Sequence, residues 1–152
     1  MHIATQFSIY LINKPGVLAA VTEALAKAKV NILALAMMDS GEHGTLRIIC
    51  EDSDKARTVL AQIHDRWTES EVLVLELDNH PGSFATIARK LADEHINILY
   101  AYASAGAPGG KTTGVFRVPD TDIGKAEKIL DSGKPKSRKP DRTVKWPPGR
   151  KS

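Results

Sequence analysis

The chain has 152 residues, of which 42% are hydrophobic and 26% are charged, values typical of a globular protein. Its longest apolar run, from Ile32 to Met38, is far shorter than the roughly 20 residues that a membrane helix needs. The formal net charge of +3 is uneven, because residues 132–152 contribute +7 and residues 1–131 contribute −4. These values exclude collagen-like, coiled-coil and fully disordered chains, and no association with a membrane is expected.

The first residues and the cysteine content indicate the cellular compartment in which the protein is expected. The sequence begins Met-His-Ile-Ala-Thr-Gln, which has neither the basic nor the apolar region of a signal peptide. Cys50 is the single cysteine, so the chain cannot form an internal disulfide. Both features predict a cytoplasmic protein.

The basic segment, residues 132–152, differs in composition from the rest of the chain. It is rich in Lys, Arg, Pro and Gly and poor in apolar residues, a composition typical of disorder. Two alternatives remain for it. One is an electrostatic contact with an acidic partner or a nucleic acid, and the other is a docked strand at Thr143–Trp146.

Two parts of the chain repeat each other in order. Asn13-Lys14-Pro15-Gly16 recurs 66 residues later as Asn79-His80-Pro81-Gly82. Val30-Asn31-Ile32-Leu33 recurs at the same offset as Ile96-Asn97-Ile98-Leu99. Beyond the Gly-rich stretch Ser104–Gly114 the offset becomes 70, because a loop can absorb four extra residues. An ordered set of matches with one insertion indicates an internal duplication.

Hydrophobic periodicity predicts the order β-α-β-β-α-β in each unit, as in the ferredoxin-like fold. The first helix is expected to begin at Pro15, and a second helix to be capped by Asp52 or Ser53. The strands predicted in the first unit are Thr5–Ile12, Val30–Met38, Thr45–Cys50 and a short Arg66–Ser70. In the second unit they are Val72–Leu77, Ile96–Ser104 and Thr113–Val118, and Thr143–Trp146 is the candidate closing strand. We therefore expect an α+β fold of two tandem domains, 1–70 and 71–131, each with an antiparallel sheet and helices on one face.

The duplicated motifs resemble ACT domains. That family has a strand, an Asn/Asp-x-Pro-Gly turn, an apolar-periodic helix and an Asn-Ile strand, and the resemblance covers about residues 3–131. The chain is similar to stand-alone tandem ACT proteins that have no catalytic domain. The regulatory small subunit of acetolactate synthase is a nearby relative with one such motif, but the second Pro-Gly motif of this chain argues against that assignment.

The resemblance implies a small ligand, most often an amino acid, bound at an interface between two domains. The positions that it implies lie at the Pro-Gly turn, at the start of the following helix and at the Asn-Ile strand. In the first unit they are Asn13, Gly16, Val17, Leu18, Asn31 and Ile32. In the second unit they are Asn79, Gly82, Ser83, Phe84, Asn97 and Ile98.

Physical chemistry supports these positions independently of the resemblance. The unpaired N–H groups of a helix N-terminus suit a carboxylate, and glycine lets the backbone approach a ligand closely. The Asn side chain can contact both the carboxylate and the ammonium group of an amino acid. The first pocket would be aliphatic, at Val17 and Leu18, and the second more polar and aromatic, at Ser83 and Phe84. The plainer alternative is that the Pro-Gly turns and the Asn residues serve only local structure.

The sequence shows no catalytic constellation, no zinc-ligand spacing and no nucleotide-binding fingerprint. We therefore expect a non-enzymatic protein without metal or cofactor, and a homo-oligomer, with a dimer as the simplest form. The alternative function is a regulatory subunit that contacts an amino-acid biosynthetic enzyme such as acetolactate synthase. A nucleic-acid binder is disfavoured, because the predicted strands lack the aromatic residues on which RNA bases stack.

Overall fold

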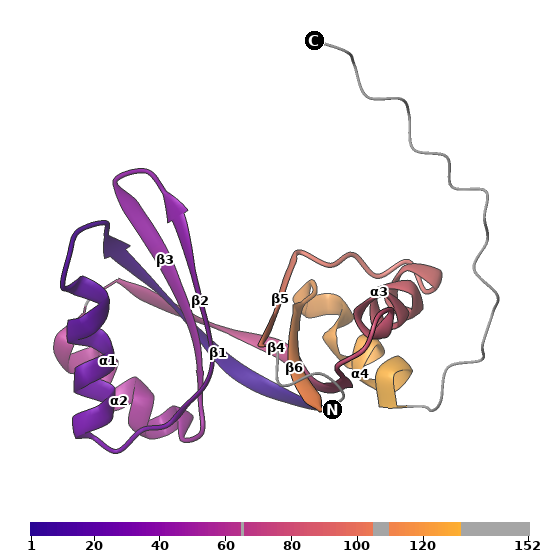
Figure 1. The fold of residues 1–152 in the computed structure, drawn as a ribbon, viewed down its shortest axis with the longest axis horizontal. Coiled ribbons are helices and arrows are strands. Elements are labelled where there is room, and N and C mark those ends of the chain that lie inside the picture. The colour runs from indigo at the N-terminus through magenta and orange to yellow at the C-terminus, as the bar shows by residue number, and fades with distance from the viewer. Residues whose placement is uncertain (65, 105–109, 132–152) are drawn as a thin grey trace, which may run out of the picture.

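The computed structural model describes residues 1–64, 66–104 and 110–131. Six strands and four α-helices alternate along this part of the chain (Figure 1). The first unit contains β1 (His2–Ile12), α1 (Val17–Lys27), β2 (Ile32–Ser40), β3 (His43–Cys50) and α2 (Ser53–Ile63). The second contains β4 (Trp67–Asp78), α3 (Ser83–Asp93), β5 (Tyr100–Ser104), β6 (Lys111–Arg117), a 3₁₀ turn (Asp120–Asp122) and α4 (Ile123–Asp131). The basic segment and its candidate strand at 143–146 lie outside the described residues.

All six strands form one antiparallel sheet in the order β2-β3-β1-β4-β6-β5. The two units join edge to edge, because β1 pairs with β4 from His2↔Val74 to Ile9↔Trp67. The α+β class and the duplicated ferredoxin-like pattern are therefore confirmed, and the two units share a continuous sheet.

Each of the two central strands serves both units. The first part of β4 closes the sheet of the first unit beside β1, and its second part pairs with β6 from Leu73↔Phe116 to Asp78↔Lys111. The start of β1 takes the closing position of the second unit in return, since His2–Thr5 pair with residues 71–74. The predicted boundary between residues 70 and 71 falls inside β4.

Three local predictions differ from the structure. Helix α1 begins at Val17 rather than at Pro15, because Gly16 adopts a left-handed conformation (φ 89°) that cannot continue into a helix. The predicted strand from Ile96 begins only at Tyr100. The segments predicted as separate strands on either side of residue 71 form the single strand β4. Asp52 does cap α2, since its carboxylate accepts the Lys55 amide at 2.9 Å.

The helices cover one side of the sheet in two separate layers. Phe7 and Ile9 of β1 pack with Val21 and Leu25 of α1 in the first core, and Phe116 lies in the second core. Figure 1 shows α1 and α2 at one end of the molecule and α3 and α4 at the other. The strands run between these two helical layers, so their uncovered faces turn toward the middle of the molecule.

The sheet curls so strongly that its uncovered faces meet. The guanidinium carbon of Arg47 on β3 lies 4.2 Å from the ring centroid of Tyr100 on β5. Four strand spacings separate these strands in the sheet order, which would place them about 19 Å apart if the sheet were flat. The concave face therefore encloses a third, smaller core. Its buried members are Ala34, Ile49, Val72, Val74 and Val115.

Candidate functional site

The Asn-Lys-Pro-Gly turn of the first unit lies against the tip of the β2–β3 hairpin. The Asn13 side chain donates to the Gly41 carbonyl at 3.2 Å, and its backbone amide donates to the Glu42 carbonyl at 2.9 Å. The side chains of Val17 and Leu18 are half-buried and pack against the first core. Gly16 is exposed, with no heavy atom within 4 Å of the position that a Cβ would occupy. At this end of the unit the backbone of the turn is therefore exposed, beside the aliphatic side chains of Val17 and Leu18.

The corresponding turn of the second unit is more polar and more aromatic. Gly82 again has a left-handed conformation, with φ 93°. The Ser83 hydroxyl lies 3.2 Å from Nδ1 of His80. Phe84 is 40% exposed and stacks on the buried Phe116, with 4.7 Å between ring centroids. The surroundings of the two turns thus differ in chemistry, and two different pockets stay a prediction.

Charge also distinguishes the second turn. Asp78, which immediately precedes the motif, accepts a hydrogen bond from the Lys111 ammonium at 2.6 Å. This contact lowers the pKa of Asp78 and raises that of Lys111. The residue at the same repeat position in the first unit is the exposed Ile12. The second turn thus has an ion pair at its rim, and the first has an apolar side chain.

The N-termini of α1 and α3 carry no side-chain cap and no acidic residue in the first turn. Helix α2, by contrast, is capped by Asp52 and has Asp54 in its first turn. The first N–H groups of a helix have no partner within the helix, and the helix dipole gives this end positive character. The two repeated turns therefore leave the positive ends of their helices available to an anion.

The predicted Asn-Ile positions lie at the other end of each unit. Asn31 and Ile32 follow α1 in the chain, and Asn97 and Ile98 follow α3. An 11-residue helix spans about 16 Å, so Asn31 is separated from Gly16 by roughly this distance. Asn31 and Asn97 are exposed, and the Asn31 carbonyl accepts the Glu51 amide at 3.0 Å. One unit alone cannot present both of its elements to one amino acid.

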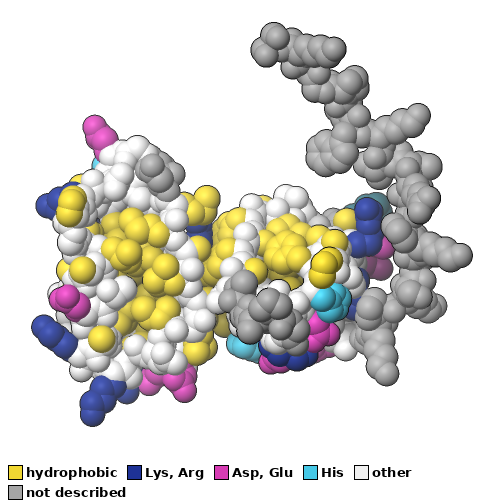
Figure 2. Space-filling view, viewed as in Figure 1, with side chains coloured by type: hydrophobic (Ala, Val, Ile, Leu, Met, Phe, Trp, Pro, Cys, Tyr) yellow, Lys and Arg dark blue, Asp and Glu magenta, His cyan; other side chains and the backbone are white. Residues whose placement is uncertain are grey.

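Apolar side chains are exposed beside both outer edges of the sheet. Leu33, Leu35 and Met37 on the edge strand β2 are 41–48% exposed. Leu99, which occupies the repeat position of Leu33, is 52% exposed just before the opposite edge strand β5. Figure 2 shows apolar side chains gathered in both halves of this face of the molecule. Exposed strand edges with apolar side chains are prone to pair with another chain.

Comparisons with known proteins identify the family of this fold. A family profile described as an ACT domain pair matches residues 1–134. The chain belongs to the ACT domain pair family. ACT domains are regulatory, ligand-binding domains, and the resemblance seen in the duplicated motifs is confirmed. No curated protein matches the chain.

Several solved structures resemble this ACT pair. Protein BT0572 from Bacteroides thetaiotaomicron is 34% identical, with a TM-score of 0.76 over 84% of this chain and 86% of that chain. The ligand-free regulatory subunit of aspartate kinase from Thermus thermophilus is 14% identical, with a TM-score of 0.61 over 86% and 95%. A structure of aspartokinase alpha and beta subunits is 20% identical, with a TM-score of 0.53 over the same shares. The last two share the fold, and the relation to acetolactate synthase stays a prediction.

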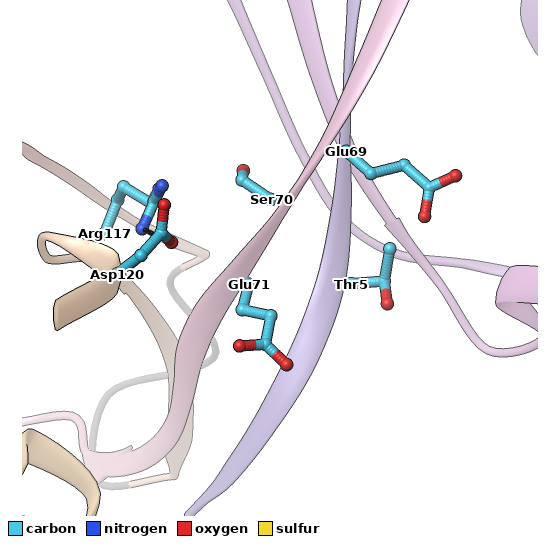
Figure 3. A pocket seen from close by; sticks show the side chains of 6 residues that line it. All are labelled: Thr5, Glu69, Ser70, Glu71, Arg117 and Asp120. Atoms are coloured by element: carbon cyan, nitrogen blue, oxygen red, sulfur yellow. Dashed lines mark ion pairs between the residues drawn. The ribbon is translucent and has the colours of Figure 1, made fainter. Parts of the chain in front are cut away.

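The concavities of the ACT pair include few of the predicted positions. One of about 400 Å³ lies where the two units join (Figure 3), and none of the predicted site residues lines it. Its side chains are already paired in part: Arg117 contacts Asp120 at 2.9 Å, and Arg57 lowers the pKa of Glu69 by hydrogen bonding. A second, of about 630 Å³, includes Asn31 together with Glu51 and the start of α2.

Sequence reasoning missed a polar cluster on the concave face. Gln6 is fully buried, donates to the Tyr100 hydroxyl at 2.5 Å and accepts from the Tyr102 hydroxyl at 2.9 Å. Burial raises the pKa of Tyr102, whereas the nearby Arg47 opposes this rise. The only sequence signal was that Gln6 and Ser8 alternate with Phe7 and Ile9, which predicts a solvent-facing side of a strand.

No described helix is long and apolar enough to cross a membrane. The described residues also contain no group of three or more His, Cys, Asp or Glu side chains arranged to hold a metal ion.

Proposed function

We propose that this ACT pair is a non-catalytic regulator that binds an amino acid at an interface between ACT domains of two copies of the chain. The observation that carries the proposal is the pair of uncapped helix N-termini, each preceded by a left-handed glycine at the same position of the repeat. The ligand carboxylate would accept the free N–H groups of Val17 and Leu18 in the first unit. In the second unit the N–H of Phe84 has the corresponding place, because the Ser83 N–H donates to the His80 carbonyl at 3.3 Å.

The separation of the Asn-Ile elements from the turns supports a second copy as part of the site. Helices α1 and α3 lie at opposite ends of the molecule, so the two turns of one chain face different surroundings (Figure 1). Two units placed side by side in antiparallel orientation would bring Asn31 or Asn97 of one to the glycine turn of the other. The exposed Leu33 and Leu99 would then be covered by the same contact.

The ligand would act by stabilising one assembly over another. A ligand shifts an equilibrium only by the difference between its affinities for the two states. An amino acid held by two copies binds the dimer and not the monomer, so it favours association. The two turns also differ in chemistry, and we propose that the first prefers an aliphatic side chain and the second a more polar or aromatic one.

A thermal-shift screen against the twenty amino acids tests the proposal. A ligand present at 100 times its dissociation constant adds about 2.7 kcal/mol to the stability of the folded state. Asn31→Ala and Asn97→Ala should abolish the shift in the corresponding site without changing the unliganded melting temperature, because both side chains are exposed. Gly16→Val and Gly82→Val should also abolish it, at some cost in folding since φ is positive at both positions.

A second candidate function is that of a regulatory subunit that contacts an amino-acid biosynthetic enzyme. The exposed apolar side chains of β2 favour it, since they offer a surface to a partner of any kind. Absence of any amino-acid shift, together with co-purification of an enzyme from the source cells, would support this candidate. A shift that survives all four site substitutions would show that neither turn is the ligand site.

A further inference from the structure

The concave face of the sheet carries a guanidinium group that has no carboxylate partner among the described residues. Nη1 of Arg47 lies 2.9 Å from the sulfur of Met38, and the guanidinium stacks on the Tyr100 ring at 4.2 Å. The Nε atom of Arg47 is buried and has no hydrogen-bond partner within residues 1–64, 66–104 and 110–131. Buried polar groups of native proteins are nearly always hydrogen-bonded, so an orphaned donor on a charged group requires an explanation.

Two other arginines show what this group lacks. Arg57 uses Nε and Nη2 to hold the two carboxylate oxygens of Glu69, at 2.6 and 2.8 Å. Arg117 contacts the Asp120 carboxylate at 2.9 Å. The side of Arg47 that corresponds to the occupied side of Arg57 makes no hydrogen bond within the described part of the chain. A planar guanidinium fork fits a carboxylate with two parallel bonds, as Arg57 demonstrates.

On the concave face, strand register places Arg47 between a row of buried residues and a row of residues that is partly exposed to solvent. The residues directly opposite Arg47 are Ser8 on β1 and Ala36 on β2. One row deeper, the residues are buried: Gln6, Ile49 and Ala34. One row toward solvent, the residues are Tyr10, Thr45 and Met38, with Tyr10 43% and Met38 53% exposed. The Arg47 row is thus reached from solvent past Tyr10 and Met38.

We propose that Arg47 is the anchor of a second binding site, which takes the carboxylate of a small monoanion on the concave face between the two units. The register neighbours of Arg47 carry no charge, so one negative charge neutralises the guanidinium and a phosphate dianion would leave one charge unbalanced. In this site the hydroxyl of Ser8, the residue opposite Arg47 on β1, would donate to the same carboxylate. This site shares no residue with the glycine turns. It can therefore be tested independently of the proposed function.

Met38 lies at the entrance to the proposed site, where its side chain is 53% exposed. A thioether is a weak hydrogen-bond acceptor, and its flexible side chain moves at little cost. An incoming carboxylate accepts from Nε and Nη2, the two atoms with which Arg57 holds Glu69, and Nη1 keeps its contact with the Met38 sulfur. Tyr100 keeps the guanidinium plane in place, because its hydroxyl is held by the buried Gln6.

Nuclear magnetic resonance of the arginine Nε–H groups tests the site directly. The full chain is titrated with sodium acetate, and sodium chloride keeps the ionic strength constant. We expect a saturable shift of the Arg47 Nε–H signal at millimolar acetate. The Arg57 Nε–H signal is the internal control and should not shift, because Glu69 already occupies it.

Variants separate binding from folding. Arg47→Gln should abolish the saturable response of the other concave-face signals, whereas Arg89→Gln, at an exposed position of α3, should leave it intact. Arg47→Lys keeps the charge but loses the fork and should weaken acetate binding several-fold. Met38→Ala should leave acetate binding nearly unchanged, because the Met38 sulfur contacts Nη1, on the other side of the guanidinium from Nε.

Three results would overturn the proposal. They are a wild-type Arg47 signal that does not saturate, a response that sodium chloride alone reproduces, and inorganic phosphate that saturates the site at lower concentration than acetate. The wild-type titration decides the matter even if Arg47→Gln does not fold.

Discussion

The side-chain amide of Gln6 donates to the hydroxyl of Tyr100 at 2.5 Å, although the two residues lie 94 positions apart in the chain. Gln6 lies on the first strand of the first unit, and Tyr100 on the edge strand of the second. The same amide accepts a hydrogen bond from Tyr102 at 2.9 Å. One buried side chain thus connects the two halves of the curled sheet at its concave face.

Replacing Gln6 should destabilise the whole chain. Gln6→Leu has a similar volume but leaves the Tyr100 and Tyr102 hydroxyls without their partner. A buried polar group left unsatisfied costs about 1–3 kcal/mol, and we expect a loss within this range. Chemical denaturation followed by circular dichroism measures it. Tyr10→Phe, on the exposed end of the same strand, is the matched control and should change stability by less than about 0.5 kcal/mol.

The burial of Gln6 could not be predicted from the sequence. In an isolated ferredoxin-like unit one face of the sheet is open, so a polar residue alternating with Phe7 and Ile9 is expected to face water. Here the open faces of two units turn toward each other and bury the side chain. That arrangement depends on sheet curvature over six strands, which no local pattern encodes.

The shared strands have a similar explanation. Glu69, Ser70 and Glu71 interrupt the apolar pattern, and the sequence therefore predicts two strands, Arg66–Ser70 and Val72–Leu77, that are broken at Glu71. In the structure they lie within β4, at the stretch of the sheet between the two helical layers. The Pro-Gly turns were more predictable, because a left-handed conformation after proline is a local property of glycine. The distance from Gly16 to Asn31 was less predictable from the motif, since it is set by the length of α1.

A substitution at Ile3 should destabilise mainly the second unit, although Ile3 belongs to the first strand. Ile3 pairs with Leu73 and packs against the second core. Ile3→Ala should cost about 1–3 kcal/mol, because the side chain is only partly buried. Hydrogen exchange should show greater loss of protection in β6 and α3 than in α1.

Ile12→Ala, on the same strand but 56% exposed, provides the comparison and should leave exchange in both units unchanged. Uniform loss of protection after Ile3→Ala would indicate that the two units unfold as one, which would contradict the prediction.

Two glycines should respond in opposite ways to alanine. At Gly114 a Cβ would lie 2.9 Å from Leu77 Cδ1 and 3.0 Å from Phe116 Cε2, and both side chains are buried. Gly114→Ala should therefore destabilise by about 1–3 kcal/mol through overpacking. At Gly124, in α4, a Cβ would meet nothing within 4 Å, so Gly124→Ala should stabilise by about 0.5–1 kcal/mol. Thermal and urea denaturation of both variants show whether each substitution raises or lowers the free energy of unfolding.

Cys50 should make the stability of the chain depend on pH in the alkaline range. Burial raises the pKa of this thiol from 9.0 to about 11. Between these values the unfolded chain releases the proton and the folded chain keeps it, so the folded state binds more protons. Stability therefore falls as pH rises from about 9 to about 11, by about 2 kcal/mol at most. Below about pH 8 the thiol is protonated in both states and contributes almost no slope.

The free energy of unfolding measured in urea at pH 8, 9, 10 and 11 isolates this contribution when wild type is compared with Cys50→Ala. Tyrosines also ionise in this range, but they do so in both proteins and cancel in the difference. We expect the stability gap between the two proteins to narrow steadily above pH 9. Iodoacetamide at pH 8 gives a second readout, since the buried thiol should react only when the chain unfolds. A gap that stays constant up to pH 11 would show that the thiol ionises with the same pKa in both states, and that its burial has no effect on proton binding.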